Sequence, residues 1–168
     1  TSFRKGVAHT LIEEQGHVRL YMERMKDMGI TFGDYPLFKH FWAQVPYLIT
    51  PAAYVSAMSL TFEQANLDFA PAYGKAFLEG GDSESSKLMQ TIFEDEIRHV
   101  TFGSVWLRKL DPTANTLWES YLRNKPSNLG AWRGKGSPFQ HEARLQAHLD
   151  QDWVTNILNV TKTQEMKS

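Results

Sequence analysis

Two long segments with helical periodicity each carry a glutamate and a histidine three residues apart, Glu14 and His17 in the first and Glu96 and His99 in the second. On an α-helix such residues project from one face, so each pair can direct a carboxylate oxygen and an imidazole nitrogen at one point. A fold that uses both pairs together must place the two helices face to face. A helical bundle meets that condition.

The neighbours of these residues indicate that the pairs are buried. Ile92 and Val100 lie one turn before and one turn after Glu96, on its face of the helix. A third glutamate, Glu63, lies in another helical segment, beside Leu60 and Leu67. Carboxylates and imidazoles on a buried face are costly unless they are paired or bind a metal. The sequence therefore predicts a metal site whose ligands are Glu14, His17, Glu63, Glu96 and His99; the alternative is a set of solvated charges and hydrogen-bonded histidines.

Helical periodicity covers most of the chain, and no segment alternates as a strand would, so we expect an all-α fold. Caps and breakers predict helices at about 2–28, 36–45, 50–67, 84–109, 112–123 and 139–158, the last bent near Asp150. A break at Asp68 to Pro71 should separate a shorter helix that ends near Glu79.

The organisation of the chain is simple. We expect one helical domain over residues 1–160, followed by a frayed polar tail over 161–168. Residues 124–138 are rich in Pro, Gly, Ser and Lys and should form a long surface loop that covers or shapes a substrate entrance.

The composition of the 168 residues excludes several classes of protein. The net charge is −1 without a basic stripe, which argues against a nucleic-acid partner. No apolar run is long enough to span a membrane, and we expect neither a membrane partner nor a signal peptide. The chain has no cysteine, so thiolate ligands and disulfides are excluded, and a cytoplasmic location is the default expectation.

Several other polar and aromatic residues are weaker candidates for a functional role. Glu13, Glu94 and Asp95 project about 100° or more away from the neighbouring ligands, so we expect them at the surface or hydrogen-bonded to a ligand. The remaining histidines should be packed, hydrogen-bonded or at the surface: His9, His40, His141 and His148. Four tryptophans are expected in the core: Trp42, Trp106, Trp118 and Trp153.

The expected ligand set determines the expected metals. Carboxylates and neutral imidazoles suit iron or manganese, and bridging carboxylates hold two such ions about 3.5–4 Å apart. We expect two metal ions, iron first and manganese second, with Glu63 or Glu96 as the bridge. Such a pair can use dioxygen to oxidise a bound substrate or to oxidise stored ferrous iron.

Several blocks of the sequence resemble the bacterial ferritin-like family catalogued as domain of unknown function 455. These blocks are residues 13–18, 33–36, 63–71, 81–82, 94–103 with Trp106, and 138–144. The Asp-Glu-Ile-x-His-Val-x-x-Gly block at 95–103 is the most specific of them.

The resemblance implies a ferritin-like four-helix bundle with additional C-terminal helices. Glu14 and His17 would belong to its second ligand helix, Glu63 to the third, and Glu96 and His99 to the fourth. The first ligand helix of that pattern would lie before Thr1. We therefore expect either a longer protein or a site that a segment of a partner chain completes.

We expect an oxygen-dependent oxidase or hydroxylase whose partners are a small-molecule substrate and dioxygen, with a homo-oligomer as one form of assembly. Non-catalytic iron binding or storage is one alternative. A helical interaction module with a vestigial metal site is another. Hydroxylation of a modified nucleoside in RNA occurs elsewhere in the superfamily, but the balanced charge does not favour it.

Overall fold

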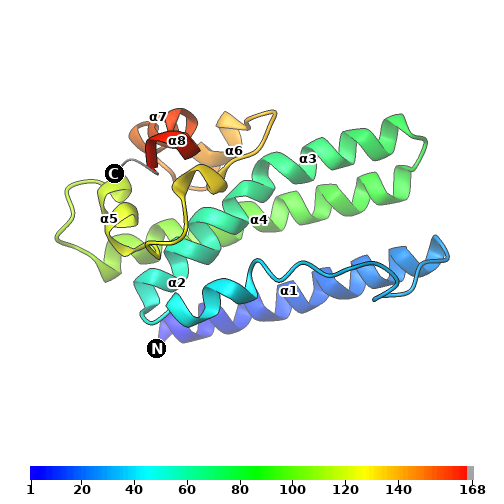
Figure 1. Ribbon diagram of the computed structural model, residues 1–168, viewed down its shortest axis with the longest axis horizontal. Coiled ribbons are helices and arrows are strands. Elements are labelled where there is room, and N and C mark those ends of the chain that lie inside the picture. The colour runs from blue at the N-terminus through cyan, green and yellow to red at the C-terminus, as the bar shows by residue number, and fades with distance from the viewer. Residues whose placement is uncertain (166–168) are drawn as a thin grey trace.

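The computed structural model describes residues 1–165, and in this part of the chain every regular element is helical (Figure 1). The α-helices are α1 (Ser2–Asp27), α2 (Pro51–Ala57), α3 (Gln64–Glu79), α4 (Ser83–Leu110), α5 (Leu117–Asn124), α6 (His141–Gln146), α7 (Gln151–Asn159) and α8 (Lys162–Glu165). The other helical elements are the 3-10 helices η1 (Trp42–Tyr47) and η3 (Ala131–Gly134) and the π-helix η2 (Met58–Glu63).

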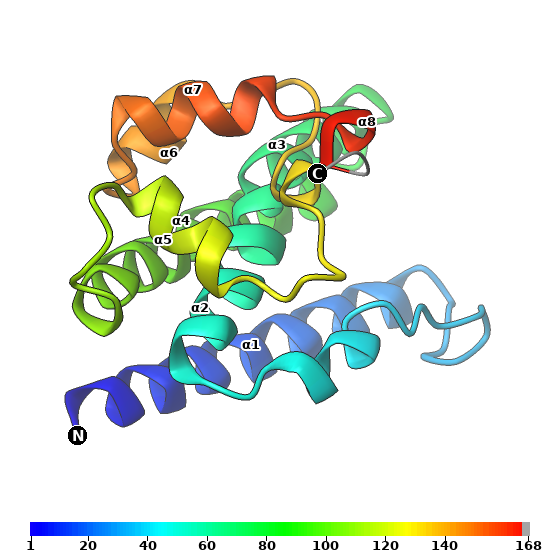
Figure 2. The same ribbon diagram turned by 60° about the vertical axis from the view of Figure 1, so that its left-hand side comes forward.

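Helices α3 and α4 form an antiparallel pair at the centre of the molecule (Figure 1). Helix α1 lies along one side of this pair, and the connection 28–50 runs back beside it. The short helices α5 to α8 lie on the opposite side of α3 and α4, as the turned view shows (Figure 2). The predicted all-α fold is therefore confirmed for the described residues.

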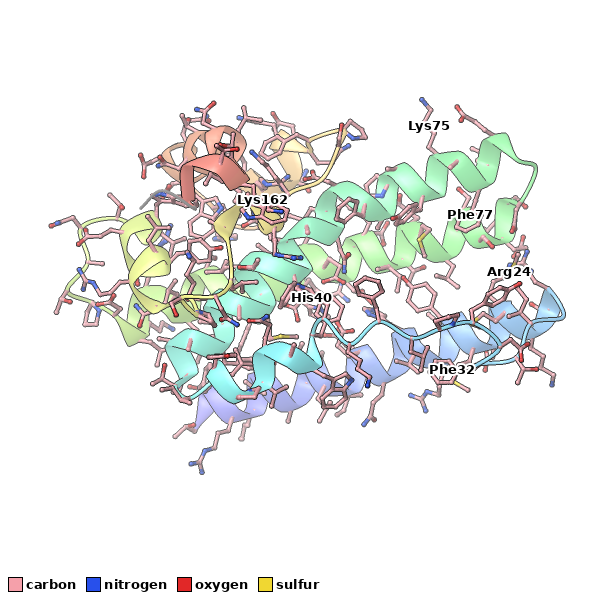
Figure 3. All side chains as sticks on the ribbon, viewed as in Figure 1. Arg24, Phe32, His40, Lys75, Phe77 and Lys162 are labelled. Carbon is pink, nitrogen blue, oxygen red and sulfur yellow. The ribbon has the colours of Figure 1, made fainter. Side chains whose placement is uncertain are left out.

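The two long helices that carry the Glu-x-x-His pairs begin and end close to their predicted limits. Asp82 caps α4 by accepting a hydrogen bond from the Ser85 backbone N–H at 2.9 Å. Gly29, just after α1, has a φ of +74°, a conformation in which glycine avoids the strain of a side chain. At this end of the bundle Arg24 donates hydrogen bonds to Asp82 and Ser85, which ties α1 to the start of α4 (Figure 3).

The predicted break at Asp68 to Pro71 is wrong, because α2, η2 and α3 follow one another without interruption and Pro71 lies inside α3. The Asp68 carboxylate, which could have competed for nearby backbone donors, is buried and bound by Arg144 instead. Pro71 removes one backbone hydrogen bond from the helix. Tertiary packing compensates for this loss, and the helix continues past Pro71.

Three other element predictions need correction. The segment 36–45 forms no α-helix; Pro46 has no N–H to donate, and only the short η1 forms there. Helix α5 begins at Leu117, where Thr116 caps it, and not near residue 112. The segment 139–158 is two helices, with Asp150 as the N-cap of the second. Of the predicted tail, α8 covers 162–165, and residues 166–168 lie outside the described part.

The main apolar core lies between the α3–α4 pair and the C-terminal helices. Its fully buried large members include Leu60, Leu107, Tyr121, Trp153 and Ile157. The prediction of a core position is confirmed for Trp153 and wrong for Trp42, whose side chain is 76% exposed.

A glycine lets η2 and α4 approach closely. A Cβ added at Gly103 would lie 2.4 Å from the Ser59 Cβ, a distance that real side chains do not tolerate. Close contact at this point places Glu63, at the end of η2, beside the centre of α4.

Helix α1 contacts the bundle differently from the other long helices. Its two buried residues, Thr10 and His17, are both polar. Large apolar side chains of α1 and of the connection 28–50 remain exposed, among them Leu11, Ile12 and Phe38. Over the described residues, no helix combines the length and the hydropathy that crossing a membrane requires.

Candidate metal centre

The structure brings all five predicted ligands together between α1, η2 and α4. Their side chains form two groups of potential ligands, each with atoms that lie within 4.8 Å of one another. One group contains Glu14, Glu63 and His99, and the other contains Glu14, His17 and Glu96. Glu14 therefore belongs to both groups.

The distances between these atoms fit ligands that surround a common ion. His99 Nδ1 lies 3.1 Å from Glu14 Oε1 and 3.4 Å from Glu96 Oε2, and His17 Nδ1 lies 3.5 Å from Glu14 Oε2. Bonds of about 2.0–2.2 Å, typical of nitrogen and carboxylate ligands, place two ligands at a right angle about 3 Å apart. The observed spacings are close to that value.

Four buried atoms in this cluster have no hydrogen-bond partner among the described residues: Glu14 Oε1, Glu63 Oε2, Glu96 Oε2 and His99 Nδ1. His99 Nδ1 and Glu14 Oε1 are close enough for an ion pair, but they are not aligned as a hydrogen bond. Buried polar atoms nearly always have a hydrogen-bond partner, so four neighbouring atoms without one require an explanation. Two bound cations, one at each group of potential ligands, would satisfy all of them.

The opposite nitrogen of each histidine meets a carboxylate from the other helix. His17 Nε2, on α1, lies 2.8 Å from Asp95 Oδ2 of α4, and His99 Nε2, on α4, lies 3.1 Å from Glu13 Oε2 of α1. These contacts orient the rings so that both Nδ1 atoms face the cluster, an arrangement common for metal-binding histidines. Of the two expected positions, surface or hydrogen-bonded to a predicted ligand, Glu13 and Asp95 take the second, whereas Glu94 faces Gln90 at the surface.

The ionisation of the cluster follows from the crowding of charges. Burial raises the pKa of Glu14, but His17 and His99 outweigh burial and lower this pKa to about 2. Glu14, against the effect of burial and with help from Asp95, raises the pKa of His17 to about 9. Burial lowers the pKa of His99, yet Glu14 and Glu96 outweigh it and raise this pKa to about 11.

Glu63 differs from the other glutamates. Burial, followed by repulsion from Glu96, raises the pKa of Glu63 to about 8. In the metal-free protein, ionising this buried carboxylate costs free energy because the charge is poorly solvated. A cation beside it would remove that cost, because the positive charge replaces the missing solvation.

A cavity of about 370 Å³ opens beside the cluster. Much of its wall is apolar and comes from α1, η2 and the connection 28–50: Val7, Leu11, Phe41, Met58 and Phe62. Three of the clustered carboxylates, Glu14, Glu63 and Glu96, also face it. None of the lining residues comes from 124–138, and Leu129 of that loop packs behind the wall against Phe62 instead.

Sequence reasoning missed two polar residues of the site. Asn66 donates a hydrogen bond to Glu96 Oε1 at 2.9 Å, and it lies one turn after Glu63 on the same helical rod. Tyr54 lines the cavity, and burial together with the charges of Glu63 and Glu14 raises its pKa to about 12. The spacing of Asn66 from Glu63 was a usable signal; nothing in the sequence pointed to Tyr54.

The other histidines lie outside the ligand cluster. His9 contacts Glu13 at 3.0 Å, and His40, on the connection 28–50, packs edge-on against Phe62 (Figure 3). His141 lies beside Glu142 and Gln151 in the C-terminal helices. His148 has a φ of +59° between α6 and α7.

Comparison with known proteins identified a family. No curated protein and no solved structure matched the chain. One family model matched residues 1–155, which is most of the 168-residue sequence. The chain therefore belongs to the family described as "Protein of unknown function (DUF455)".

Proposed function

We propose that this protein holds a two-metal carboxylate centre of the ferritin-like type and uses it, with dioxygen, to oxidise or hydroxylate a small molecule. The observation that carries the proposal is the set of four buried oxygen and nitrogen atoms on Glu14, Glu63, Glu96 and His99 that have no hydrogen-bond partner among the described residues. An oxygen and nitrogen donor set of this kind suits iron or manganese. Iron is our first choice and manganese our second.

The geometry favours one assignment of the ligands. Glu14 belongs to both groups, so we assign the bridge to Glu14 rather than to Glu63 or Glu96, which the sequence favoured. Glu63 and His99 would complete one subsite, and His17 and Glu96 would complete the other. Glu96 also approaches His99, which keeps the two subsites adjacent.

When bound, the metal pair would supply the electron transfer that activates dioxygen. Hydroxylation of a C–H bond is then balanced if dioxygen takes two electrons from the substrate and two from an external reductant, with two protons, to give one hydroxyl group and one water. The protein's own contribution is to fix the ligands, to limit water in the cavity and to orient the substrate. The apolar wall selects a compact, largely apolar molecule, and Tyr54 and Asn66 offer polar contacts beside the carboxylates.

The metal assignment is tested by His99→Ala. We expect this variant to lose most of its bound iron with little change in helix content, because His99 Nδ1 lies at the centre of the cluster. His141→Ala is the matched control, since that histidine lies in the C-terminal helices. Elemental analysis of both purified variants and of the unsubstituted protein is the measurement; an unchanged iron content in His99→Ala would refute the assignment.

Storage of iron is separated from oxidation by titrating the protein with ferrous iron in air. An oxidase should stop binding iron at about two ions per chain. A storage protein should accumulate far more. Continued uptake well beyond two ions would favour storage over the proposed activity.

The cavity is tested by filling it. Met58→Trp should lower the affinity for 1-naphthol, a compact aromatic alcohol, by about tenfold or more, equivalent to ~1.4 kcal/mol. Met28→Trp is the control, because that methionine is exposed just after α1. Fluorescence titration gives both affinities. Equal affinities of the two variants for 1-naphthol would refute the claim that this cavity binds the substrate.

A further inference from the structure

Arg98 joins the outer contacts of the two histidines. Its Nη2 atom donates a hydrogen bond to Glu13 Oε1 at 3.2 Å and another to Asp95 Oδ1. The second oxygen of each carboxylate accepts from a histidine, so Glu13 joins Arg98 to His99 and Asp95 joins Arg98 to His17. One guanidinium therefore stands at the middle of a chain that runs from one ring to the other.

The connections cross between two helices. His17 and Glu13 come from α1, whereas His99, Asp95 and Arg98 come from α4, and each ring meets a carboxylate of the opposite helix. A shift of α1 along α4 would therefore disturb both ring contacts together. Arg98 opposes such a shift because it holds a carboxylate of each helix.

We propose that Arg98 is a positioning residue that couples the orientations of His17 and His99, and through them the two metal subsites. The inference rests on the proposed metal function for its consequence, but the coupling of the rings is a property of the metal-free protein. Groups that hydrogen-bond directly to metal-binding histidines commonly change metal affinity by about 10- to 100-fold when they are removed, and Arg98 lies one contact further out. The Arg98 side chain is 58% exposed, so water screens its ion pairs, and we expect a smaller loss of about 3- to 10-fold.

The first test needs no metal. The Nε2–H protons of His17 and His99 donate to Asp95 and Glu13, so they should exchange slowly with water and be observable by proton NMR. In Arg98→Gln, exchange should accelerate severalfold at both rings. A change at neither ring or at only one ring would overturn the coupling.

Three further variants separate the effects at the two rings and control for the loss of an exposed arginine. Glu13→Ala removes the direct partner of His99 and also the hold of Arg98 on α1, so exchange should accelerate most at His99 and less at His17; Asp95→Ala should have the larger effect at His17 and the smaller at His99. Arg108→Gln is the matched control, because Arg108 lies on the same helix, is 42% exposed and pairs with Asp150 away from the cluster. An effect of Arg108→Gln equal to that of Arg98→Gln would overturn the inference.

The second test measures the consequence for metal binding by titration with Co²⁺, whose visible absorption reports its ligands. Arg98→Gln should weaken both binding steps, whereas Arg108→Gln should weaken neither. Unchanged Co²⁺ affinity in Arg98→Gln, despite faster ring exchange, would overturn the positioning role. If the unsubstituted protein binds no Co²⁺, the proposed metal function fails, while the exchange experiment still decides whether Arg98 couples the rings.

Discussion

Replacing Arg144 by methionine should destabilise the protein more than any single change at its surface. Arg144 and Asp68 are both fully buried, and two parallel hydrogen bonds of 2.8 and 2.7 Å join them. Methionine fills much of the same volume without the charge. The Asp68 carboxylate would keep only the backbone N–H groups of Gly136 and Gln140 as donors.

The expected loss follows from the uncompensated charge. Removing one partner of a buried ion pair typically costs about 3–5 kcal/mol, because the other charge stays buried without its counterion. For a chain of this length each kcal/mol corresponds to about 2–4 °C, so the melting temperature should fall by about 6–20 °C. Arg108→Met is the control: its pair with Asp150 is partly exposed and should contribute at most about 1 kcal/mol.

Urea unfolding followed by far-ultraviolet circular dichroism measures both effects, provided that the slope with denaturant is unchanged. The double variant Asp68→Asn with Arg144→Met should be more stable than the sum of the single losses by about 1–3 kcal/mol, since it no longer buries a lone carboxylate. A loss in Arg144→Met no greater than that in Arg108→Met would show that the pair does not hold the loop 124–138 and α6 onto α3.

Two further predictions concern the helices around the site. Gly103→Ala should cost about 1–3 kcal/mol in urea unfolding, because its Cβ would meet Ser59, whereas Gly16→Ala, which faces open space, should be neutral or slightly stabilising. In the metal-free protein the folded pKa values of His17, about 9, and Glu63, about 8, both lie above their unfolded values, so the native state binds more protons and stability should fall as pH rises. The Glu63 contribution is lost between about pH 4.5 and 8 and that of His17 between about 6.5 and 9. Unfolding midpoints at several pH values, with a chelator present, should show a shallower decline up to pH 8 in Glu63→Gln; an identical pH dependence would contradict the raised pKa.

The long helices and the ligand cluster were predictable because they depend on local signals. Helix α4 has a capping aspartate at one end, and its Glu96 and His99 share a face by spacing alone. The same spacing on α1 gave Glu14 and His17. Placing the two pairs face to face gives each carboxylate and imidazole a partner, so we expected them to lie together because burying them apart would be costly.

Contacts between distant residues were not predictable in the same way. Asp68 and Arg144 are 76 positions apart, and Asp68 beside Pro71 favours a helix break when only its neighbours are considered. The π-helix η2 likewise adds a residue to the helical repeat just before Glu63, which period-based reasoning cannot detect. Trp42 was placed in the core on its residue type, but its segment packs against too little of the molecule to bury it.

The position of α1 links the site to the fold. Phe3 packs on Phe102 and Trp106 at one end of the helix, and Arg24 binds the start of α4 at the other. Between these ends the buried residues of α1 are polar, and its contacts with α4 include the carboxylate–histidine pairs and the Arg98–Glu13 ion pair.

The histidines proposed to bind metal are thus among the groups that attach α1 to the bundle. Without an ion, that attachment depends on protonated histidines beside crowded carboxylates, with Glu63 resisting ionisation. Bound metal ions would replace those protons and satisfy the four atoms that lack a hydrogen bond. Because an ion that binds only the docked arrangement stabilises that arrangement, metal affinity and the docking of α1 must change together in any variant of the cluster.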